Sequence, residues 1–167
     1  MKRLSLLFFF YLATVNTTFS QEIIKGLKNT VSLVQKSAKI PSIKNKDGST
    51  IVLRYKESEG LMVTMGKNGK NSDFSGPFPN ALMVQVGEMD IDKDGKLEIL
   101  VGSRTSPESV EVEIYKKAEF EIFYKLWSTL TGFDSFEFTG DGHIKLYDTK
   151  GNFGLYTIME DGKLNAM

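Results

Sequence analysis

The sequence predicts an all-β fold, a mostly antiparallel sheet or sandwich, preceded by one N-terminal helix. From residue 50 onward the chain consists of short apolar runs, and in VEVEIY, FEIFY and IKLY apolar residues alternate with polar ones. Such alternation is typical of strands with one solvated face. Asp-Gly and Asn-Gly pairs lie between or beside the runs and supply the positive φ that tight hairpins require. Because no linker divides these runs, we expect a single domain.

The first twenty residues have the layout of a secretory signal peptide. The basic residues Lys2 and Arg3 precede an apolar run over residues 4–15, and small residues at positions 18 and 20 mark a cleavage site after Ser20. The apolar run is shorter than the ~20 residues that span a bilayer as a helix. We therefore expect a secreted or periplasmic domain over residues 21–167, without stable membrane insertion after cleavage. An uncleaved anchor or a buried strand is the alternative.

The composition excludes several classes of protein. The chain contains no cysteine, which rules out disulfide scaffolds, thiol enzymes and zinc sites with cysteine ligands. It carries 21 basic and 21 acidic residues, and a formal net charge of zero disfavours a nucleic-acid partner. Removal of Lys2 and Arg3 with the signal peptide would leave a slightly acidic domain.

The segment that follows the signal peptide predicts a helix over residues 22–38. Its apolar residues recur at three- and four-residue spacings, which place them in one stripe along a helix: Ile23, Ile24, Leu27, Val31, Val34 and Ala38. Gly26 and the β-branched Thr30 weaken this prediction. Pro41 ends the segment, because proline cannot continue a helix.

Nine strands are predicted after this segment, at residues 51–55, 61–65, 82–86, 97–101, 110–115, 120–126, 136–138, 144–147 and 153–159. Turns are predicted at the pairs 47–48, 59–60, 68–69, 141–142 and 161–162, each of which ends in glycine. The long polar stretch over residues 66–80 is the candidate for a mobile loop. Its residues Phe74 and Phe78 are either an exposed contact surface or attached to the core.

The segment DIDKDGKLE at residues 90–98 has the spacing of a calcium loop. Acidic side chains at its positions 1, 3, 5 and 9 can all turn toward one point; they are Asp90, Asp92, Asp94 and Glu98. Gly95 permits the sharp turn that this requires, and the backbone carbonyl of Lys96 can add a further oxygen. Such a set of hard oxygens suits Ca²⁺, which takes six to eight of them, better than the smaller and strictly octahedral Mg²⁺.

This loop does not have the features of an EF-hand. An EF-hand needs a bidentate Glu at position 12, which here is Val101, and helices on both sides, where this sequence predicts strands. The alternative to a metal site is a polar hairpin turn without an ion. In that case only Lys93 and Lys96 would offset the repulsion among the clustered carboxylates.

Residues 86–103 (VGEMDIDKDGKLEILVGS) resemble the FG-GAP/VCBS repeat, in which a DxDxDGxxD/E calcium loop lies between two strands. The resemblance implies that Asp90, Asp92, Asp94, Glu98 and the carbonyl of Lys96 bind the ion, and it suggests an exported bacterial protein. Members of this family usually carry several copies that form propeller blades, but residues 134–142 and 148–151 lack the alternating acids. We therefore expect one blade-like unit within a small sandwich or curved sheet.

These observations predict an exported, soluble, non-catalytic calcium-binding domain. It would serve as an interaction or structural module for a protein or glycan partner. The alternative is a small secreted hydrolase acting on glycan or peptide through two carboxylates about 5–10 Å apart. The candidates for such a pair are Glu111, Glu113, Glu119, Glu121, Asp134 and Asp141.

Two further features have both a structural and a functional interpretation. His143 is the only histidine and follows Asp141 closely, so it is a candidate general base. Its setting, Gly-Asp-Gly-His, favours a hairpin turn instead. An aromatic-rich stretch indicates either core packing or a ligand groove; it contains Tyr124, Trp127, Phe133, Phe136 and Phe138.

Overall fold

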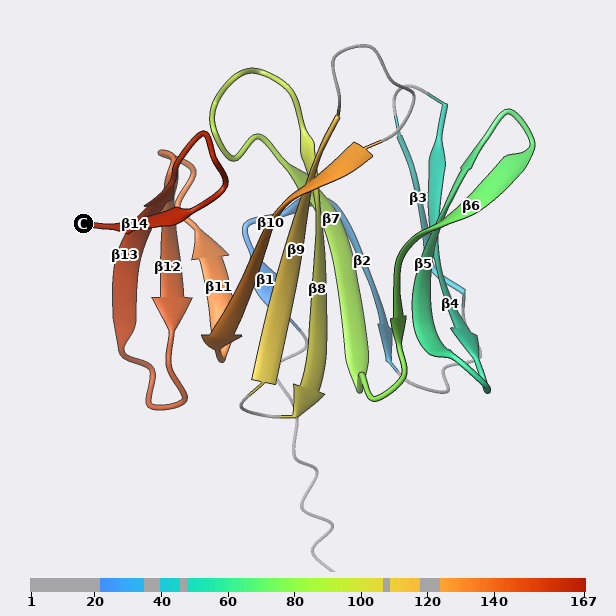
Figure 1. Ribbon diagram of the computed structural model, residues 1–167, viewed down its shortest axis with the longest axis horizontal. Helices are drawn as coiled ribbons and strands as arrows, with labels where there is room; N and C mark the ends of the chain where they lie inside the picture. Colours follow the sequence, from blue (N-terminus) through green and yellow to red (C-terminus); the bar gives the residue numbers. More distant parts are fainter. Residues whose placement is uncertain (1–21, 35–39, 46–47, 107–108, 118–123) are drawn as a thin grey trace, which may run out of the picture.

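The computed structural model describes residues 22–34, 40–45, 48–106, 109–117 and 124–167. This part of the chain contains fourteen β-strands and no helix (Figure 1). It therefore also contains no helix that could cross a membrane. The predicted signal peptide at residues 1–20 lies outside the described residues.

The strands form three sheets, each built around four strands that follow one another in the chain. The first sheet contains β3 (Ser42–Lys44), β4 (Thr50–Lys56), β5 (Gly60–Lys67) and β6 (Lys70–Phe78). The middle sheet contains β7 (Met83–Met89), β8 (Glu98–Ser106), β9 (Ser109–Lys117) and β10 (Tyr124–Phe133). The C-terminal sheet contains β11 (Ser135–Phe138), β12 (His143–Tyr147), β13 (Phe153–Ile158) and β14 (Leu164–Ala166).

Two N-terminal strands complete the last two sheets. Strand β2 (Lys28–Val34) pairs antiparallel with β7, and β1 (Ile24–Lys25) pairs parallel with β11. Every other pairing is antiparallel in the part of the chain that the structure describes. The prediction of a mostly antiparallel all-β fold is thus confirmed, although the strands form three sheets and not a single curved one.

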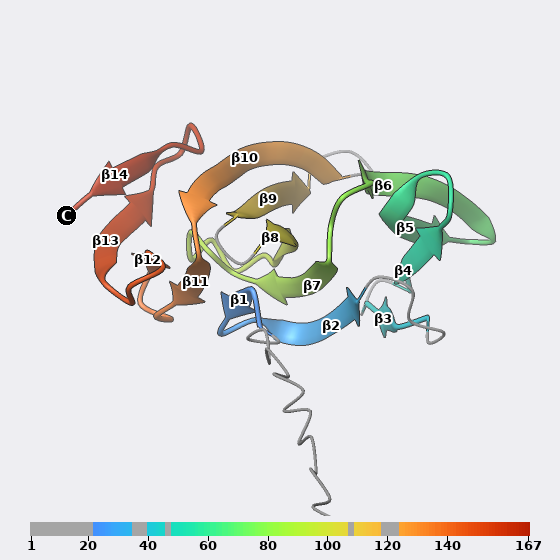
Figure 2. The same cartoon turned by 90° about the horizontal axis from the view of Figure 1, so that it is seen from below.

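The middle sheet lies between the other two (Figures 1 and 2), and its strands β7 and β8 are buried on both faces. Successive residues of β8 show how this is achieved, because side chains alternate between the two faces of a strand. Ile99 and Val101 pack into the core shared with the first sheet, whereas Leu100 packs into the core shared with the C-terminal sheet. All three side chains are at most 1% exposed. This double burial explains the continuous apolar run at residues 97–101.

The three sheets follow a spacing of 47 residues in the sequence. Gly48, Gly95 and Gly142 are each separated by this interval. Each lies in the turn that joins the first two of the four consecutive strands, with φ angles of 82°, 85° and 94°. Glycine adopts such left-handed angles without steric cost. The described residues thus contain three successive groups of four consecutive strands, and in the sequence only the second group has the full acidic loop.

The helix predicted over residues 22–38 is wrong, because β1 and β2 occupy its described part. The spacing of the apolar residues has another cause: Ile23 and Ile24 are buried against the C-terminal sheet, and Leu33 is buried against the first sheet. Gly26 and Asn29 have φ angles of 86° and 44°, which a right-handed helix excludes. Residues 35–38 of the predicted helix lie outside the described residues.

The predicted strands are found in the described residues, with shifted ends. Residues 120–123 of one of them lie outside the description, and β10 begins at Tyr124. The predicted mobile loop at residues 66–80 is wrong, since it consists largely of β6, a nine-residue strand at the edge of the first sheet. Its exposed polar residues hide the strand pattern. Phe74 and Phe78 pack against the core between the first and middle sheets, which supports attachment to the core.

A buried glutamine holds the N-terminal strands against the middle sheet. Gln85 is 1% exposed, and its Oε1 accepts hydrogen bonds of 2.8 Å from the backbone N–H groups of both Ile23 and Ile24. Its Nε2 donates to the carbonyl of Ile24 at 3.1 Å and to Oγ1 of Thr30 at 3.2 Å. One side chain therefore provides partners for three buried backbone groups.

Replacing this glutamine should destabilise the fold. In Gln85→Leu the amides of Ile23 and Ile24 lose their shared acceptor, so we expect the free energy of unfolding in urea to fall by about 2–4 kcal/mol. Val34→Ala, on the neighbouring β2 and 56% exposed, is the control and should change it by less than about 0.5 kcal/mol. Equal effects of the two substitutions would contradict this role of Gln85.

Candidate metal centre

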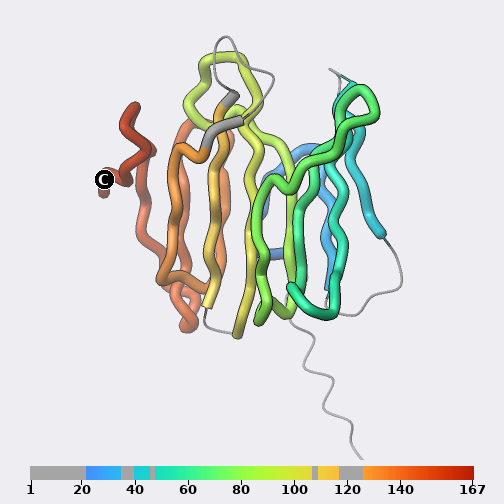
Figure 3. Tube along the Cα trace, turned by 45° about the vertical axis from the view of Figure 1, so that its right-hand side comes forward, coloured from blue at the N-terminus to red at the C-terminus, as the bar shows by residue number. Residues whose placement is uncertain are grey.

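The acidic loop joins β7 to β8 at one end of the middle sheet (Figure 3). Ile91, the second residue of the loop, is 6% exposed and belongs to the core between the middle and C-terminal sheets. Glu98, the last acidic residue, begins β8 and pairs with Met89 of β7. The loop is therefore fixed at both ends and attached to the core through Ile91.

The backbone of the loop curls around its own aspartates. Oδ2 of Asp90 accepts a hydrogen bond of 3.1 Å from the N–H of Gly95, and Oδ1 of Asp94 accepts one of 2.8 Å from the N–H of Lys96. Oδ1 of Asp92 accepts a longer one of 3.3 Å from Asp94. Lys93 and Gly95 have φ angles of 62° and 85°, so the chain makes the sharp turn that the glycine predicts.

Three of the predicted ligands come together. One carboxylate oxygen each from Asp90, Asp92 and Glu98 lies within 4.8 Å of the other two. Oδ1 of Asp90 is buried and has no hydrogen-bond partner in the described residues. A buried oxygen without a partner is costly, and a hard cation would satisfy it.

The other two predicted ligands are not in this group of side chains. The carboxylate of Asp94 accepts from the backbone of Lys96 and lies 3.7 Å from the Nζ of the same residue. Lys96 is predicted to contribute its backbone carbonyl, and the side-chain cluster does not test that prediction. The structure thus brings together the first, third and ninth positions of the predicted site.

Glu98 is the buried member of the cluster. It is 2% exposed, and its Oε2 accepts a 2.8 Å hydrogen bond from the N–H of Ile91. Burial raises the pKa of Glu98 to about 7, and the negative charges of Asp92 and Asp94 act in the same direction. The hydrogen bond from Ile91 opposes this rise only in part. The positive charge of Lys116 also opposes it, so the loop holds a carboxyl group whose raised pKa persists despite a nearby ammonium.

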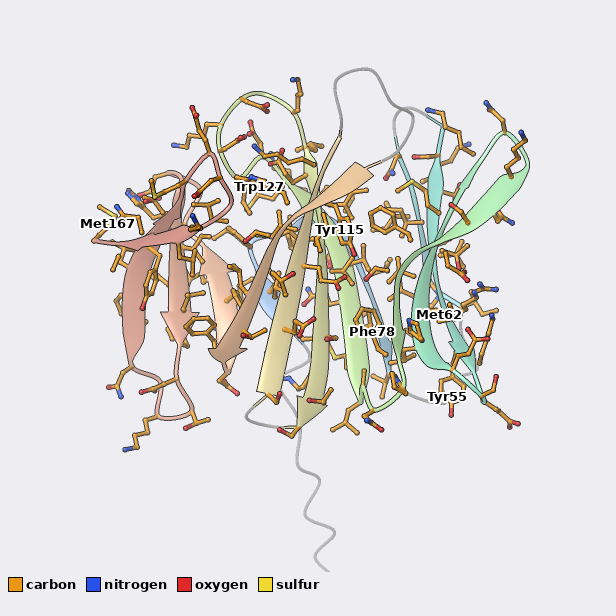
Figure 4. The ribbon with its side chains drawn as sticks, viewed as in Figure 1. Tyr55, Met62, Phe78, Tyr115, Trp127 and Met167 are labelled. Atoms are coloured by element: carbon orange, nitrogen blue, oxygen red, sulfur yellow. The ribbon has the colours of Figure 1, made fainter. Side chains whose placement is uncertain are left out.

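Asp92 has a cationic partner from another strand. Nζ of Lys116, on β9, donates a hydrogen bond to its Oδ2. Partial burial would raise the pKa of Asp92, but the hydrogen bond and positive charge of Lys116 outweigh it and hold the pKa below its ordinary value. The same Nζ lies 3.9 Å from the ring centroid of Trp127 on β10. Figure 4 shows Trp127 beside the acidic loop.

The carboxylates proposed for a hydrolase have different surroundings in the described residues. Glu111 lines a cavity of about 180 Å³ between the end of β6 and strands β8 and β9. Oε2 of Glu113, which is absent from that lining, accepts hydrogen bonds from Ser75 and Tyr115. Asp134 forms an ion pair of 3.2 Å with Arg104. Glu119 and Glu121 lie outside the described residues.

His143 lies beside a hairpin turn, and most of the aromatic stretch contacts the core. His143 begins β12, and its Nδ1 lies 2.8 Å from Asp141 in the β11–β12 turn. Hydrogen bonds from Thr139 and His143 hold the pKa of Asp141 well below its usual range. Phe136 and Phe138 belong to the core, and Phe133 and Trp127 pack against it. Tyr124 begins β10.

The sequence reasoning missed Lys116. No local pattern marks it, because only the pairing of β7, β8 and β9 brings it to a loop more than twenty residues earlier in the chain. It also missed the 47-residue spacing of Gly48, Gly95 and Gly142, although the Asp-Gly pairs at these positions are visible in the sequence.

The raised pKa of Glu98 predicts a pH-dependent stability in the presence of chelator. The folded state holds the proton up to pH about 7, whereas an unperturbed glutamate releases it near 4.5. The proton therefore stabilises the fold at low pH, and this contribution is lost as the pH rises between these values. We expect the urea midpoint of the wild type to fall across this range, and that of Glu98→Gln to fall much less. Identical slopes would contradict the prediction.

Comparisons of the chain with protein-family models, with curated proteins and with solved structures give no match. The resemblance of residues 86–103 to the FG-GAP/VCBS repeat therefore stays a prediction from the motif.

Proposed function

We propose that this protein is an exported, soluble, non-catalytic β-protein whose β7–β8 loop binds one Ca²⁺, and that it acts as an interaction or structural module for a protein or glycan partner. The observation that carries the proposal is the buried Oδ1 of Asp90, which has no hydrogen-bond partner among the residues that the structure describes. Its carboxylate belongs to a group of three whose oxygens lie within 4.8 Å of one another. Hard oxygens in this arrangement suit Ca²⁺.

The residues fit the ion in charge as well as in chemistry. Asp90, Asp92 and Glu98 would bind it directly, with Asp94 and the carbonyl of Lys96 as the remaining predicted ligands. The bound ion supplies positive charge that offsets repulsion among the carboxylates and offers Glu98 a partner for its ionised form. Since the chain has no cysteine, such an ion would stabilise the exported domain where a disulfide cannot.

The position of the loop also supports the proposal. It joins two antiparallel strands, β7 and β8, and the FG-GAP/VCBS resemblance expects a calcium loop between two strands. The corresponding β11–β12 turn is shorter, with only Asp141 between Phe138 and His143 as an acid. We therefore propose one ion for the chain and not one for each sheet.

A secreted hydrolase remains the alternative function. The observation that favours it is the position of Glu111 in the cavity between the first and middle sheets, beside Ser103, Ser109 and Asn80. A glycan- or peptide-cleaving activity that disappears in Glu111→Gln would favour this alternative over the non-catalytic role.

Calcium titration is the direct test of the proposed function. Isothermal titration of the chelator-treated protein with CaCl₂ should give heat with a stoichiometry of one ion per chain. Asp90→Asn removes the negative charge of this ligand and leaves one neutral carbonyl oxygen. It should weaken binding by at least about tenfold, in line with the loss of a charged ligand.

Asp148→Asn is the matched control for this titration. Asp148 also accepts backbone hydrogen bonds within a turn, from Lys150 and Asn152, but belongs to the β12–β13 connection. Its replacement should leave the calcium affinity unchanged. The absence of heat in the wild type, or equal affinities of wild type and Asp90→Asn, would refute the calcium site.

Thermal unfolding gives a second, independent prediction. A ligand that binds only the folded state at 100 times its Kd stabilises by about 2.7 kcal/mol, which corresponds to a rise in Tm on the order of 5–10 °C for a domain of this size. We expect this rise on adding Ca²⁺ to the wild type and its reversal by chelator. Asp90→Asn should show a much smaller rise at the same concentration, and a flat response of the wild type would contradict the stabilising role.

A further inference from the structure

We infer that the ammonium group of Lys116 competes with the metal ion for the carboxylate of Asp92. When the ion binds, displacement of Lys116 changes the surroundings of Trp127. This inference rests on the calcium site proposed above. It adds a residue that sets the affinity of that site, and a structural consequence of filling it.

The geometry places a single ammonium group between the acidic loop and an indole ring. Nζ of Lys116 is hydrogen-bonded to Oδ2 of Asp92 and lies 3.9 Å from the ring centroid of Trp127. The side chains of Lys116 and Asp92 are 29% and 24% exposed, so solvent screens this pair less than a fully exposed one. Both contacts of Lys116 are therefore attractive in the ion-free protein.

Entry of Ca²⁺ changes the balance at this point. The carboxylate of Asp92 is one of the three that converge on the candidate site, so an ion bound there attracts the same group that holds Lys116. The two cations repel each other across a few ångströms of partly shielded space. Metal binding must therefore displace the ammonium or weaken its hydrogen bond, and this cost lowers the affinity of the loop for the ion.

Displacement of Lys116 alters the surroundings of Trp127. The ammonium is one of the contacts of the indole ring, and the strength of a cation–π contact depends on the position of the cation over the ring. Nε1 of Trp127 donates a 3.0 Å hydrogen bond to the carbonyl of Glu160, in the β13–β14 turn of the C-terminal sheet. The adjacent Ser128 donates from its Oγ to the carbonyl of Gly162, at 2.5 Å.

Trp127 thus connects the loop to the neighbouring sheet. Together with the β13–β14 turn it lines an open groove of about 490 Å³ between the middle and C-terminal sheets, in which Phe133 and Lys163 also take part. Because Trp127 is the only tryptophan of the chain, its fluorescence reports on this region alone.

Lys145 provides a matched control lysine. Its Nζ lies 3.8 Å from Oε1 of Glu137 and 5.3 Å from the ring centroid of Phe153, and its side chain is also 29% exposed. It therefore has a carboxylate and an aromatic ring as partners, as Lys116 does. It lies on β12 and has no contact with the acidic loop in the interactions described.

The experiment measures calcium binding by isothermal titration and tryptophan emission in parallel, on the purified protein after chelator treatment. In the wild type, emission should change with the same midpoint as the heat. Lys116→Met removes the charge and keeps the apolar stem, so the affinity for Ca²⁺ should rise about three- to tenfold, and the emission change should be largely lost. Lys145→Met should behave like the wild type in both measurements.

The outcomes separate the inference from the proposed function. Heat without a change of emission in the wild type would overturn the inference and leave the calcium site intact. An unchanged affinity and emission response in Lys116→Met would do the same. The absence of heat in the wild type would refute the calcium site and the inference with it. If Lys116→Met does not fold, as judged by cooperative thermal unfolding in chelator, Lys116→Gln tests the same expectation with a polar side chain.

Discussion

Burial of both faces of strands β7 and β8, in the middle sheet, is the constraint on which the rest of the structure depends. A sheet that buries both faces needs a layer on each side, and the chain supplies one before it and one after it. Strand β2 extends the middle sheet, whereas β1 continues into the C-terminal sheet, and Gln85 binds the chain where it passes from one to the other. The acidic loop joins β7 and β8 at one end of the middle sheet (Figure 1).

The sequence predicts a strand wherever burial of its side chains produces a local pattern of apolar residues. The alternation in VEVEIY and the continuous run at residues 97–101 both correspond to strands, the latter because β8 is buried on two sides. The helix prediction fails at residues 22–34 for a physical reason. Their apolar side chains pack against different sheets, and the resulting three- and four-residue spacing is the same as that of an amphipathic helix. Strand β6 is missed because an exposed edge strand needs few apolar residues, and pairing with β5 stabilises it instead.

Some features of the candidate site are likewise predictable from the local sequence, and others are not. Asp90, Asp92 and Glu98 are predictable because a nine-residue loop carries its own geometry, and Gly95 marks the turn that closes it. Two properties of the site depend on tertiary structure and cannot be read from the loop. Glu98 is buried because Ile91 attaches the loop to the core between two sheets, and Asp92 is paired because β9 lies beside β8. These properties determine how the carboxylates of the loop are balanced before any ion binds.

This balance explains how such a loop can exist without an ion. Four acidic side chains within nine residues repel one another, and one of them is almost completely buried. The ammonium of Lys96 lies beside Asp94, and two single positive charges act on the carboxylates that converge: the ammonium of Lys116 on Asp92 and, below pH about 7, the proton of Glu98. A divalent cation carries the same total charge in one place, at the point where the carboxylates converge. If one divalent ion replaces the ammonium of Lys116 and the proton of Glu98, the net charge around the loop stays nearly the same. The bound ion would then connect β7, the loop and β8 through one metal centre.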